Sequence, residues 1–219
     1  MPLVIKREED TVMRKRFALI LLTLFVALLL IGRPVLVSAK NRLQHLLAAS
    51  HFLKENEHYQ QREEIFKVLS QSDIQLGDAM EIAQTVIYES RKYNIPVSLF
   101  LAIMKKESNF NVDARSSANA MGIMQIHPIT WDAYTKKMNL PVSRKKAFDP
   151  TLNIMVSAAV LNDLRNQYTR KGYRETALWD YVLSAYYGGP ESVKGGLTKS
   201  HRRYVKKVRE YADDLSRAI

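Results

Sequence analysis

The stretch that decides the fold runs from Lys105 to Pro128 and reads KKESNFNVDARSSANAMGIMQIHP. It places an acidic residue, Glu107, where an apolar, helix-forming segment gives way to a loop of small and polar residues. In the preceding segment Leu99, Ile103 and Glu107 recur at intervals of four residues, so the three side chains share one face of a helix. The carboxyl group of Glu107 is therefore expected to lie on an apolar face.

Two physical effects are expected to raise the pKa of Glu107. Burial disfavours the charged form of a carboxyl group. The negative end of the helix macrodipole, at the C-terminus, disfavours an anion as well. A carboxyl group that stays neutral near pH 7 can donate a proton, as a general acid must. The local pattern is equally that of an exposed glutamate at a frayed helix end, so both interpretations remain open at this point.

The residues around this stretch predict a mainly helical domain from Asp78 to Arg217. Apolar residues recur at intervals of three and four, and no alternating strand pattern is present. The residue before Pro96 resists helical geometry, which separates two helices, and Ser98 is expected to cap the second of them. Helices are predicted at about residues 78–93, 98–106, 129–138, 151–168, 176–187 and 200–217.

The first 39 residues are different in kind. Three basic residues at 14–16 precede an apolar run at 17–31, and small residues follow up to Ala39. This order is that of a secretory signal. The run is shorter than the roughly 20 residues of a typical membrane span, yet residues 17–37 would also serve as an uncleaved signal anchor. Cleaved signal peptide and anchor both remain open, and both predict export.

Residues 40–77 are predicted to form an amphipathic helical extension before the main domain. From Lys40 onward the chain has 27 basic and 19 acidic residues, a net charge of +8. A basic exported protein suits a polyanionic partner such as a cell wall or an anionic membrane surface, although a solvated basic surface has the same composition. The chain contains no cysteine, so disulfides and thiolate metal sites are excluded.

The chain resembles the soluble-type lytic transglycosylases, whose catalytic domain is lysozyme-like, of the goose type. The resemblance covers Asp78 to Tyr211 and rests on motifs that occur in the family's order. They are LFLAIMKKESNF, DARSSANAMGIMQIHPIT, FDPTLNIMVSAAVL, ALWDYVLSAYYGGPESV and RRYVKKVREY. The resemblance implies a mainly α, lysozyme-like fold and an exported enzyme of the periplasm or cell envelope.

The resemblance also implies a reaction and a site. The family cleaves the β-1,4 bond between N-acetylmuramic acid and N-acetylglucosamine in peptidoglycan and forms 1,6-anhydromuramic acid. Glu107 matches its general acid and then base. Ser116 and Gln125 match residues near the saccharide, Tyr186 matches a tyrosine that hydrogen-bonds the glutamate, and Met124 is expected to line the cleft. No metal or cofactor is expected.

Three positions depart from the family pattern. Asn119 stands where glycine is usual, and asparagine tolerates left-handed backbone better than most residues. Tyr187 and Gly188 replace the usual Asn-Ala pair after the loop tyrosine, which puts in question any substrate contact made through that asparagine.

Two alternatives to a transglycosylase remain open. One is a muramidase-type hydrolase of the same fold, which needs a second acid or an ordered water, and Asp113 is the nearest acidic residue in the sequence. The other is a non-catalytic wall-binding or scaffold module serving a secretion or conjugation machine in the envelope. A nucleic-acid partner is not expected, because Tyr204, Val208 and Tyr211 form a core stripe that leaves the basic residues of this helix as its outer face.

Overall fold

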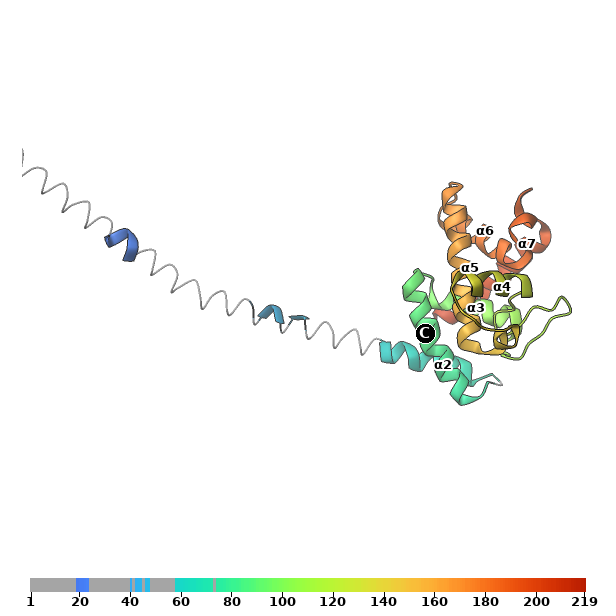
Figure 1. The fold of residues 1–219 in the computed structure, drawn as a ribbon, viewed down its shortest axis with the longest axis horizontal. Coiled ribbons are helices and arrows are strands. Elements are labelled where there is room, and N and C mark those ends of the chain that lie inside the picture. The colour runs from blue at the N-terminus through green and yellow to red at the C-terminus, as the bar shows by residue number, and fades with distance from the viewer. Residues whose placement is uncertain (1–18, 24–39, 41, 45, 48–57, 73) are drawn as a thin grey trace, which may run out of the picture. The chain divides into compact units, whose positions relative to one another are not determined.

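The computed structural model describes residues 19–23, 40, 42–44, 46–47, 58–72 and 74–219 (Figure 1). The chain separates into two compact units, Met1–Glu57 and His58–Ile219. In the first unit the described residues are helical, and most of the predicted signal segment 1–39 lies outside them. None of the helices in the described ranges has both the length and the apolar character to cross a membrane.

The second unit is helical, as the sequence predicts. A helical segment at 58–70 precedes the main elements. These are α2 (Leu76–Tyr93), α3 (Val97–Ser108), α4 (Pro128–Lys137), η1 (Arg144–Phe148), α5 (Pro150–Arg170), α6 (Glu175–Gly188), η2 (Pro190–Val193) and α7 (Lys199–Ser216). Each predicted helix begins and ends within two residues of its observed counterpart. In the described part of the chain no strand forms, and the two isolated bridges lie in the loop between α3 and α4.

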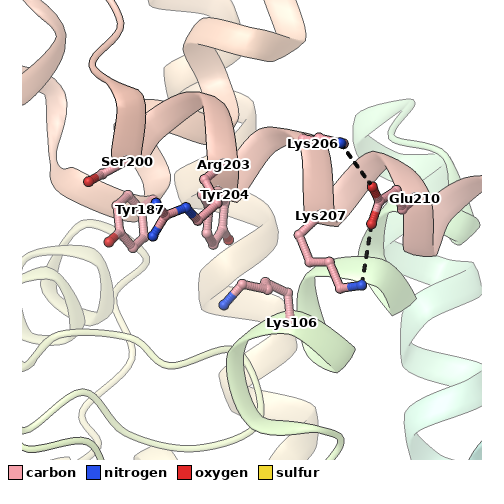
Figure 2. Close-up of a pocket in the computed structure, with 8 residues that line it drawn as sticks. All are labelled: Lys106, Tyr187, Ser200, Arg203, Tyr204, Lys206, Lys207 and Glu210. Atoms are coloured by element: carbon pink, nitrogen blue, oxygen red, sulfur yellow. Dashed lines mark hydrogen bonds and ion pairs between the residues drawn. The ribbon is translucent and has the colours of Figure 1, made fainter.

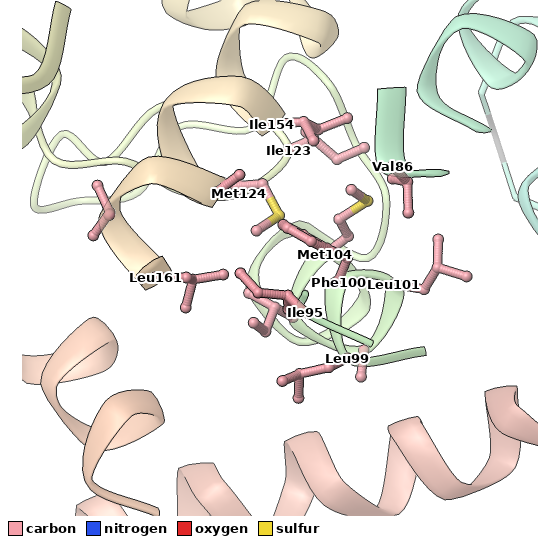
Figure 3. Close-up of a cluster of buried hydrophobic side chains, with 14 of the residues drawn as sticks. Val86, Ile95, Leu99, Phe100, Leu101, Met104, Ile123, Met124, Ile154 and Leu161 are labelled. Atoms are coloured by element: carbon pink, nitrogen blue, oxygen red, sulfur yellow. The ribbon is translucent and has the colours of Figure 1, made fainter. Parts of the chain in front are cut away.

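Helix α3 lies in the hydrophobic core of this unit. Its residues from Leu99 to Met104 are all buried, because a helix that is apolar on all sides has no face suited to solvent. Figure 3 shows its side chains Phe100, Leu101 and Met104 together with buried residues from other elements, among them Ile123 and Ile154. The last turn of α3 leaves this core, and Glu107 belongs to that turn.

The two ends of α3 are set by backbone geometry. At its C-terminus Asn109 adopts a left-handed conformation, with φ 51°. The Asn109 N–H donates to Lys105 O at 3.1 Å, and the Phe110 N–H donates to Met104 O at 3.5 Å. A left-handed residue such as Asn109 commonly ends a helix. At the N-terminus α3 begins at Val97 after Pro96, and no side chain caps it. The prediction that Ser98 caps this helix is therefore wrong, because Ser98 already lies inside the first turn.

Helices α2 and α7 pack directly against α3. Helix α7 packs against α3 and α6, and α5 packs against α2 and α6. The side chain of Asp149 caps α5 by accepting a hydrogen bond from Leu152 N at 3.2 Å. Ile65 and Leu69 are fully buried in the same core, so the compact unit begins at residue 58 and includes part of the segment 40–77 predicted as an extension. The packing of α7 on α3 is what positions the site.

Candidate active site

Glu107 and Tyr204 meet where the end of α3 lies against α7. The Tyr204 hydroxyl donates a hydrogen bond to Glu107 Oε1 at 2.5 Å. Tyr204 is buried, with 3% of its surface exposed, and Glu107 is partly buried. The Lys106 ammonium lies 5.5 Å from the centre of the Tyr204 ring. The Glu107 carboxyl group thus has a neutral hydrogen-bond donor, Tyr204, and a nearby cation, Lys106.

Burial raises the pKa of Glu107 above its ordinary value. The hydrogen bond from Tyr204 and the positive charge of Lys106 both act in the opposite direction, but burial prevails. This confirms the raised pKa expected from the apolar face of the helix. A carboxyl group in this state can supply a proton and later take one back.

The loop after Glu107 is held by a buried asparagine of α5. Asn153 is fully buried, and its Nδ2 donates to Met121 O at 3.0 Å and to Ala147 O at 2.7 Å. Its Oδ1 accepts a hydrogen bond from Met124 N at 2.8 Å. Gly122 lies against this side chain with φ +75°, a left-handed conformation that glycine adopts without strain. The segment 121–124 is therefore fixed to α5.

Two further hydroxyl groups join this loop to the helices around it. Ser108 Oγ lies 2.8 Å from Ile123 O, which supports a structural role for Ser108. The Tyr186 hydroxyl lies 2.8 Å from Met124 O and 3.2 Å from Ser157 Oγ. The prediction that Tyr186 bonds the glutamate is therefore wrong: that bond comes from Tyr204. Burial raises the pKa of Tyr186, and the charge of Glu107 raises it further, so the two side chains lie within electrostatic reach of each other.

The structure places Met124 in the core. Its side chain is fully buried and appears in Figure 3 among the core residues. The prediction that Met124 lines a cleft is wrong, because Asn153 and Tyr186 hold its backbone and direct its side chain inward. Its contribution to this region is a backbone carbonyl.

Ser116 and Gln125 hold the loop in shape. Ser116 Oγ accepts a hydrogen bond from Ala120 N at 3.0 Å and closes a turn that contains Asn119 at φ 62°. This left-handed value is the one expected for a residue standing in place of glycine. Gln125 Nε2 donates to Ala114 O at 3.0 Å and to Gly122 O at 2.9 Å. Within the described part of the chain neither side chain is hydrogen-bonded to Glu107, and Asp113 is exposed.

The unusual pair Tyr187-Gly188 belongs to an aromatic and polar cluster beside the site. The Tyr187 ring stacks on Tyr204 with centroids 4.7 Å apart and planes at 21°. At Gly188 a side chain would lie 2.6 Å from Ser192 Oγ and 2.9 Å from His201 Nε2. Glycine at 188 therefore lets η2 and α7 approach α6, and Tyr187 supports the ring that bonds Glu107.

Sequence reasoning missed the role of Tyr204. The motif RRYVKKVREY contains it, but its helical spacing with Val208 predicts only a core position. Tyr204 and Val208 are buried, as predicted, and the hydroxyl group of Tyr204 is what reaches the Glu107 carboxyl group. In the described ranges no group of three His, Cys, Asp or Glu side chains could hold a metal ion.

The sequence matches a known family and curated relatives. The model of the "Transglycosylase SLT domain" matches residues 84–208. The membrane-bound lytic murein transglycosylase C of Klebsiella pneumoniae is 44% identical over 108 residues, which are 48% of this chain and 30% of that protein. Its counterpart in Salmonella typhimurium is 42% identical over the same shares. The chain thus spans less than a third of the length of these relatives.

Solved structures share the fold. The lytic transglycosylase Slt of Pseudomonas aeruginosa, solved as an inactive mutant, has a TM-score of 0.53 at 25% identity, over 61% of this chain and 24% of that one. The 70 kDa soluble lytic transglycosylase of Escherichia coli has a TM-score of 0.56 at 21% identity, over 74% and 30%. A complex of the 70 kDa soluble lytic transglycosylase with bulgecin A has a TM-score of 0.55 at 22% identity, over 74% of this chain and 30% of that one.

Proposed function

Since the chain belongs to the transglycosylase SLT domain family, we propose that it is a lytic transglycosylase that cleaves the glycan strands of peptidoglycan. The observation that carries this proposal is Glu107: a partly buried carboxyl group with a raised pKa, hydrogen-bonded by Tyr204 where α3 ends. Its substrate would be the β-1,4 bond between N-acetylmuramic acid and N-acetylglucosamine. The curated relatives are named as murein transglycosylases.

In the first step the neutral carboxyl group of Glu107 donates its proton to the glycosidic oxygen. The bond from C1 of the muramyl residue to this oxygen breaks, and the glucosamine leaves with a free hydroxyl group. The Tyr204 hydroxyl donates to Oε1, so the proton is assigned to Oε2. The same hydrogen bond stabilises the carboxylate that remains after proton transfer.

In the second step the carboxylate accepts the proton of the muramyl C6 hydroxyl. The C6 oxygen bonds to C1 and closes the 1,6-anhydro ring, and Glu107 regains its proton. Because the nucleophile is part of the substrate, proximity replaces the activation of a water molecule. A second carboxylate is then unnecessary, whereas ordinary glycosidases use a pair. The exposed position of Asp113 in its loop is in keeping with this scheme.

The remaining predicted site residues keep proposed roles of their own. Gln125 Oε1 has no hydrogen-bond partner among the residues that the structure describes, so it is free to accept a bond from a saccharide. Ser116 and Tyr186 are proposed to border the saccharide beside Glu107. Residues 1–39 are proposed to direct export to the periplasm or cell envelope, as a cleaved signal or as an anchor.

The product of the reaction tests the proposal. The full chain would be incubated with purified peptidoglycan sacculi, with a Glu107→Gln variant as control, and the products weighed by mass spectrometry. Muropeptides lighter by one water, formed by the unaltered chain and not by the variant, are expected. Reducing ends would instead establish a hydrolase. Binding to sacculi without any product would favour a wall-binding or scaffold module.

A further inference from the structure

A cavity of about 460 Å³ lies at the opposite end of α3 from Glu107. Side chains from α2, α5, α6 and the turn between α2 and α3 line it. The residues that define this distal pocket are Arg91, Asn94, Ile95, Pro96, Arg165 and Trp179. Pro96 directly precedes the first residue of α3, whereas Glu107 belongs to its last turn. The distal pocket is therefore separate from the candidate active site.

The distal pocket has two positive charges and no carboxylate in its lining. Arg91 and Arg165 line it, and none of its lining residues is acidic. Figure 2 shows the contrasting cavity at the other end of α3, where Glu210 pairs with Lys206 and Lys207. Within the described part of the chain neither arginine forms an ion pair. Two guanidinium groups without a counter-ion favour an anion, and their planar geometry matches a carboxylate.

Hydrogen bonds hold the two guanidinium groups in place. Arg165 Nη1 donates to Asn94 O at 2.7 Å, and Nη2 donates to Asn162 Oδ1 at 3.0 Å. Arg91 Nη1 lies 2.6 Å from His58 Nδ1. A guanidinium group has five N–H donors, so each arginine keeps donors for a ligand. Because the side chains are already positioned, binding costs less conformational entropy.

The rest of the lining is suited to a peptide. Ile95, Pro96 and Trp179 supply apolar surface, and the Trp179 side chain is only partly buried. The Asn94 side chain makes no hydrogen bond within the part of the chain that the structure describes, so its amide group is available to a peptide bond. A small inorganic anion would use the arginines alone, whereas a peptide uses all three kinds of group.

An exposed apolar row on α2 leads to the distal pocket. Leu76, Met80 and Tyr88 are exposed, and their spacing in multiples of four places them on one side of the helix. Arg91 follows Tyr88 by three residues and continues this row, which is called the α2 face here. Exposed apolar residues gathered in this way mark interaction sites, and Trp, Tyr and Arg are the residue types most common in binding hot spots.

We propose that the distal pocket and the α2 face bind an acidic segment of a partner protein, in which carboxylate side chains alternate with apolar ones. The carboxylates pair with Arg91 and Arg165, and an apolar side chain covers Trp179. The rest of the segment follows the α2 face. This inference goes beyond the proposed function and does not depend on it, because the surface lies at the far end of α3 from Glu107. The partner then positions the protein without covering its site.

Peptide binding followed by NMR tests the inference. The probe is a short peptide with capped ends, in which glutamates alternate with leucines and a phenylalanine. The matched peptide has glutamine in place of every glutamate. Each is titrated into the full-length protein, and the indole N–H signals are recorded. The chain has two tryptophans: Trp179 lines the distal pocket and reports binding, whereas Trp131 is fully buried and is the internal control. A Trp179→Phe protein assigns the two signals.

The pocket variant is Arg91→Gln, because the hydrogen bond of this side chain goes to the exposed His58 and not to the core. The control is Arg170→Gln, which removes the same charge from an exposed residue of α5 outside the distal pocket. Arg91→Gln is expected to weaken binding of the acidic peptide about 3- to 10-fold, as for the loss of one partly exposed charge interaction. Arg170→Gln should leave the affinity unchanged, and added salt should reduce the difference.

Three results would overturn the inference. The first is that the acidic peptide leaves the Trp179 signal unmoved. The second is that Arg91→Gln weakens binding of the acidic and the glutamine peptide equally. The third is that sodium phosphate, or vesicles containing phosphatidylglycerol, move the Trp179 signal in an Arg91-dependent way while the acidic peptide does not. That result would assign the arginines to a phosphate group, and the two probes would tell a free phosphate from a membrane surface.

Cleavage of sacculi separates this inference from the proposed function. Arg91→Gln is expected to release muropeptides at the rate of the unaltered chain. If neither protein cleaves sacculi while the peptide results hold, the proposed function fails and the docking surface stands. If both cleave sacculi and the peptide binding shows no dependence on charge, the docking surface alone fails.

Discussion

The hydroxyl of Tyr204 donates a 2.5 Å hydrogen bond to Oε1 of Glu107, a residue 97 positions earlier in the chain. The two residues come from α7 and α3, which pack against each other. Tyr204 is in turn stacked on Tyr187 of α6. The position of the proposed acid therefore depends on how three helices are assembled.

Replacing Tyr204 with phenylalanine is expected to change how activity depends on pH. Since the hydrogen bond from Tyr204 lowers the pKa of Glu107, its loss raises that pKa further. The limb of the kcat/KM profile that reports deprotonation of Glu107 then moves to higher pH. Loss of a hydrogen bond to a charged group also predicts a kcat about 10- to 100-fold lower. Rates of muropeptide release across a pH series would measure both effects.

Tyr211→Phe is the matched control for this variant. It removes a hydroxyl group from the same helix, and its ring contacts Lys105 and Lys207 rather than Glu107. Its pH profile should coincide with that of the unaltered enzyme. A Tyr204→Phe profile with an unmoved limb would contradict the proposed link between Tyr204 and the proton of Glu107.

Glu89 is expected to make stability depend on pH. It is 2% exposed and lies 3.2 Å from Lys92, and burial raises its pKa above the ordinary value despite this lysine. The folded state then holds a proton that the unfolded state has released, so stability falls as pH rises from the ordinary pKa through the raised one. Glu89→Gln should remove this part of the slope. Thermal unfolding from pH 4 upward would measure it.

Glu107 also makes stability fall with rising pH, because its pKa is also raised, but this residue is present in both the unaltered chain and the Glu89→Gln variant. The stability of Glu89→Gln relative to the unaltered chain should therefore increase with pH. If the two unfolding curves stay a constant distance apart at every pH, Glu89 does not titrate as its burial requires.

Gly122→Ala is expected to destabilise the fold by about 3 kcal/mol, the upper range for overpacking a filled core. A Cβ there would lie closer than 3.0 Å to the Ala147 carbonyl and to Asn153 Nδ2, and φ is +75°. The control Gly172→Ala has φ +91° with nothing within 4 Å, so only backbone strain of about 1 kcal/mol applies. Denaturant unfolding of both variants separates the steric effect from the backbone strain. Equal losses in the free energy of unfolding would show that the steric overlap at Gly122 contributes nothing.

Gly188→Ala is expected to cost about 1–3 kcal/mol for the same kind of reason. The added methyl group meets Ser192 Oγ and the His201 ring, and Ser192→Ala in the same chain should recover part of the loss. Gly195→Ala, where nothing lies within 4 Å, should change stability by no more than about 0.5 kcal/mol. A harmless Gly188→Ala would show that the family's alanine is compatible with this cluster.

Local pattern was enough to predict the helices and the place of the acid. The spacing of Leu99, Ile103 and Glu107 indicates a helix whose apolar face ends in a carboxyl group, and α3 is that helix. The motif order indicates the family, which the match over residues 84–208 confirms. The helix and the place of its carboxyl group depend on residues three or four positions apart, which a sequence displays directly.

The contacts between distant segments were decided by the tertiary structure alone. The family resemblance predicts that Tyr186 bonds the glutamate and that Met124 lines the cleft, whereas Tyr204 makes the bond and Met124 is buried. Periodicity tells which residues share a face of a helix, but not which residue of another helix meets that face. The packing of α7 against α3 settles that choice, because it brings the Tyr204 hydroxyl to Glu107 and leaves Tyr186 to bond the loop.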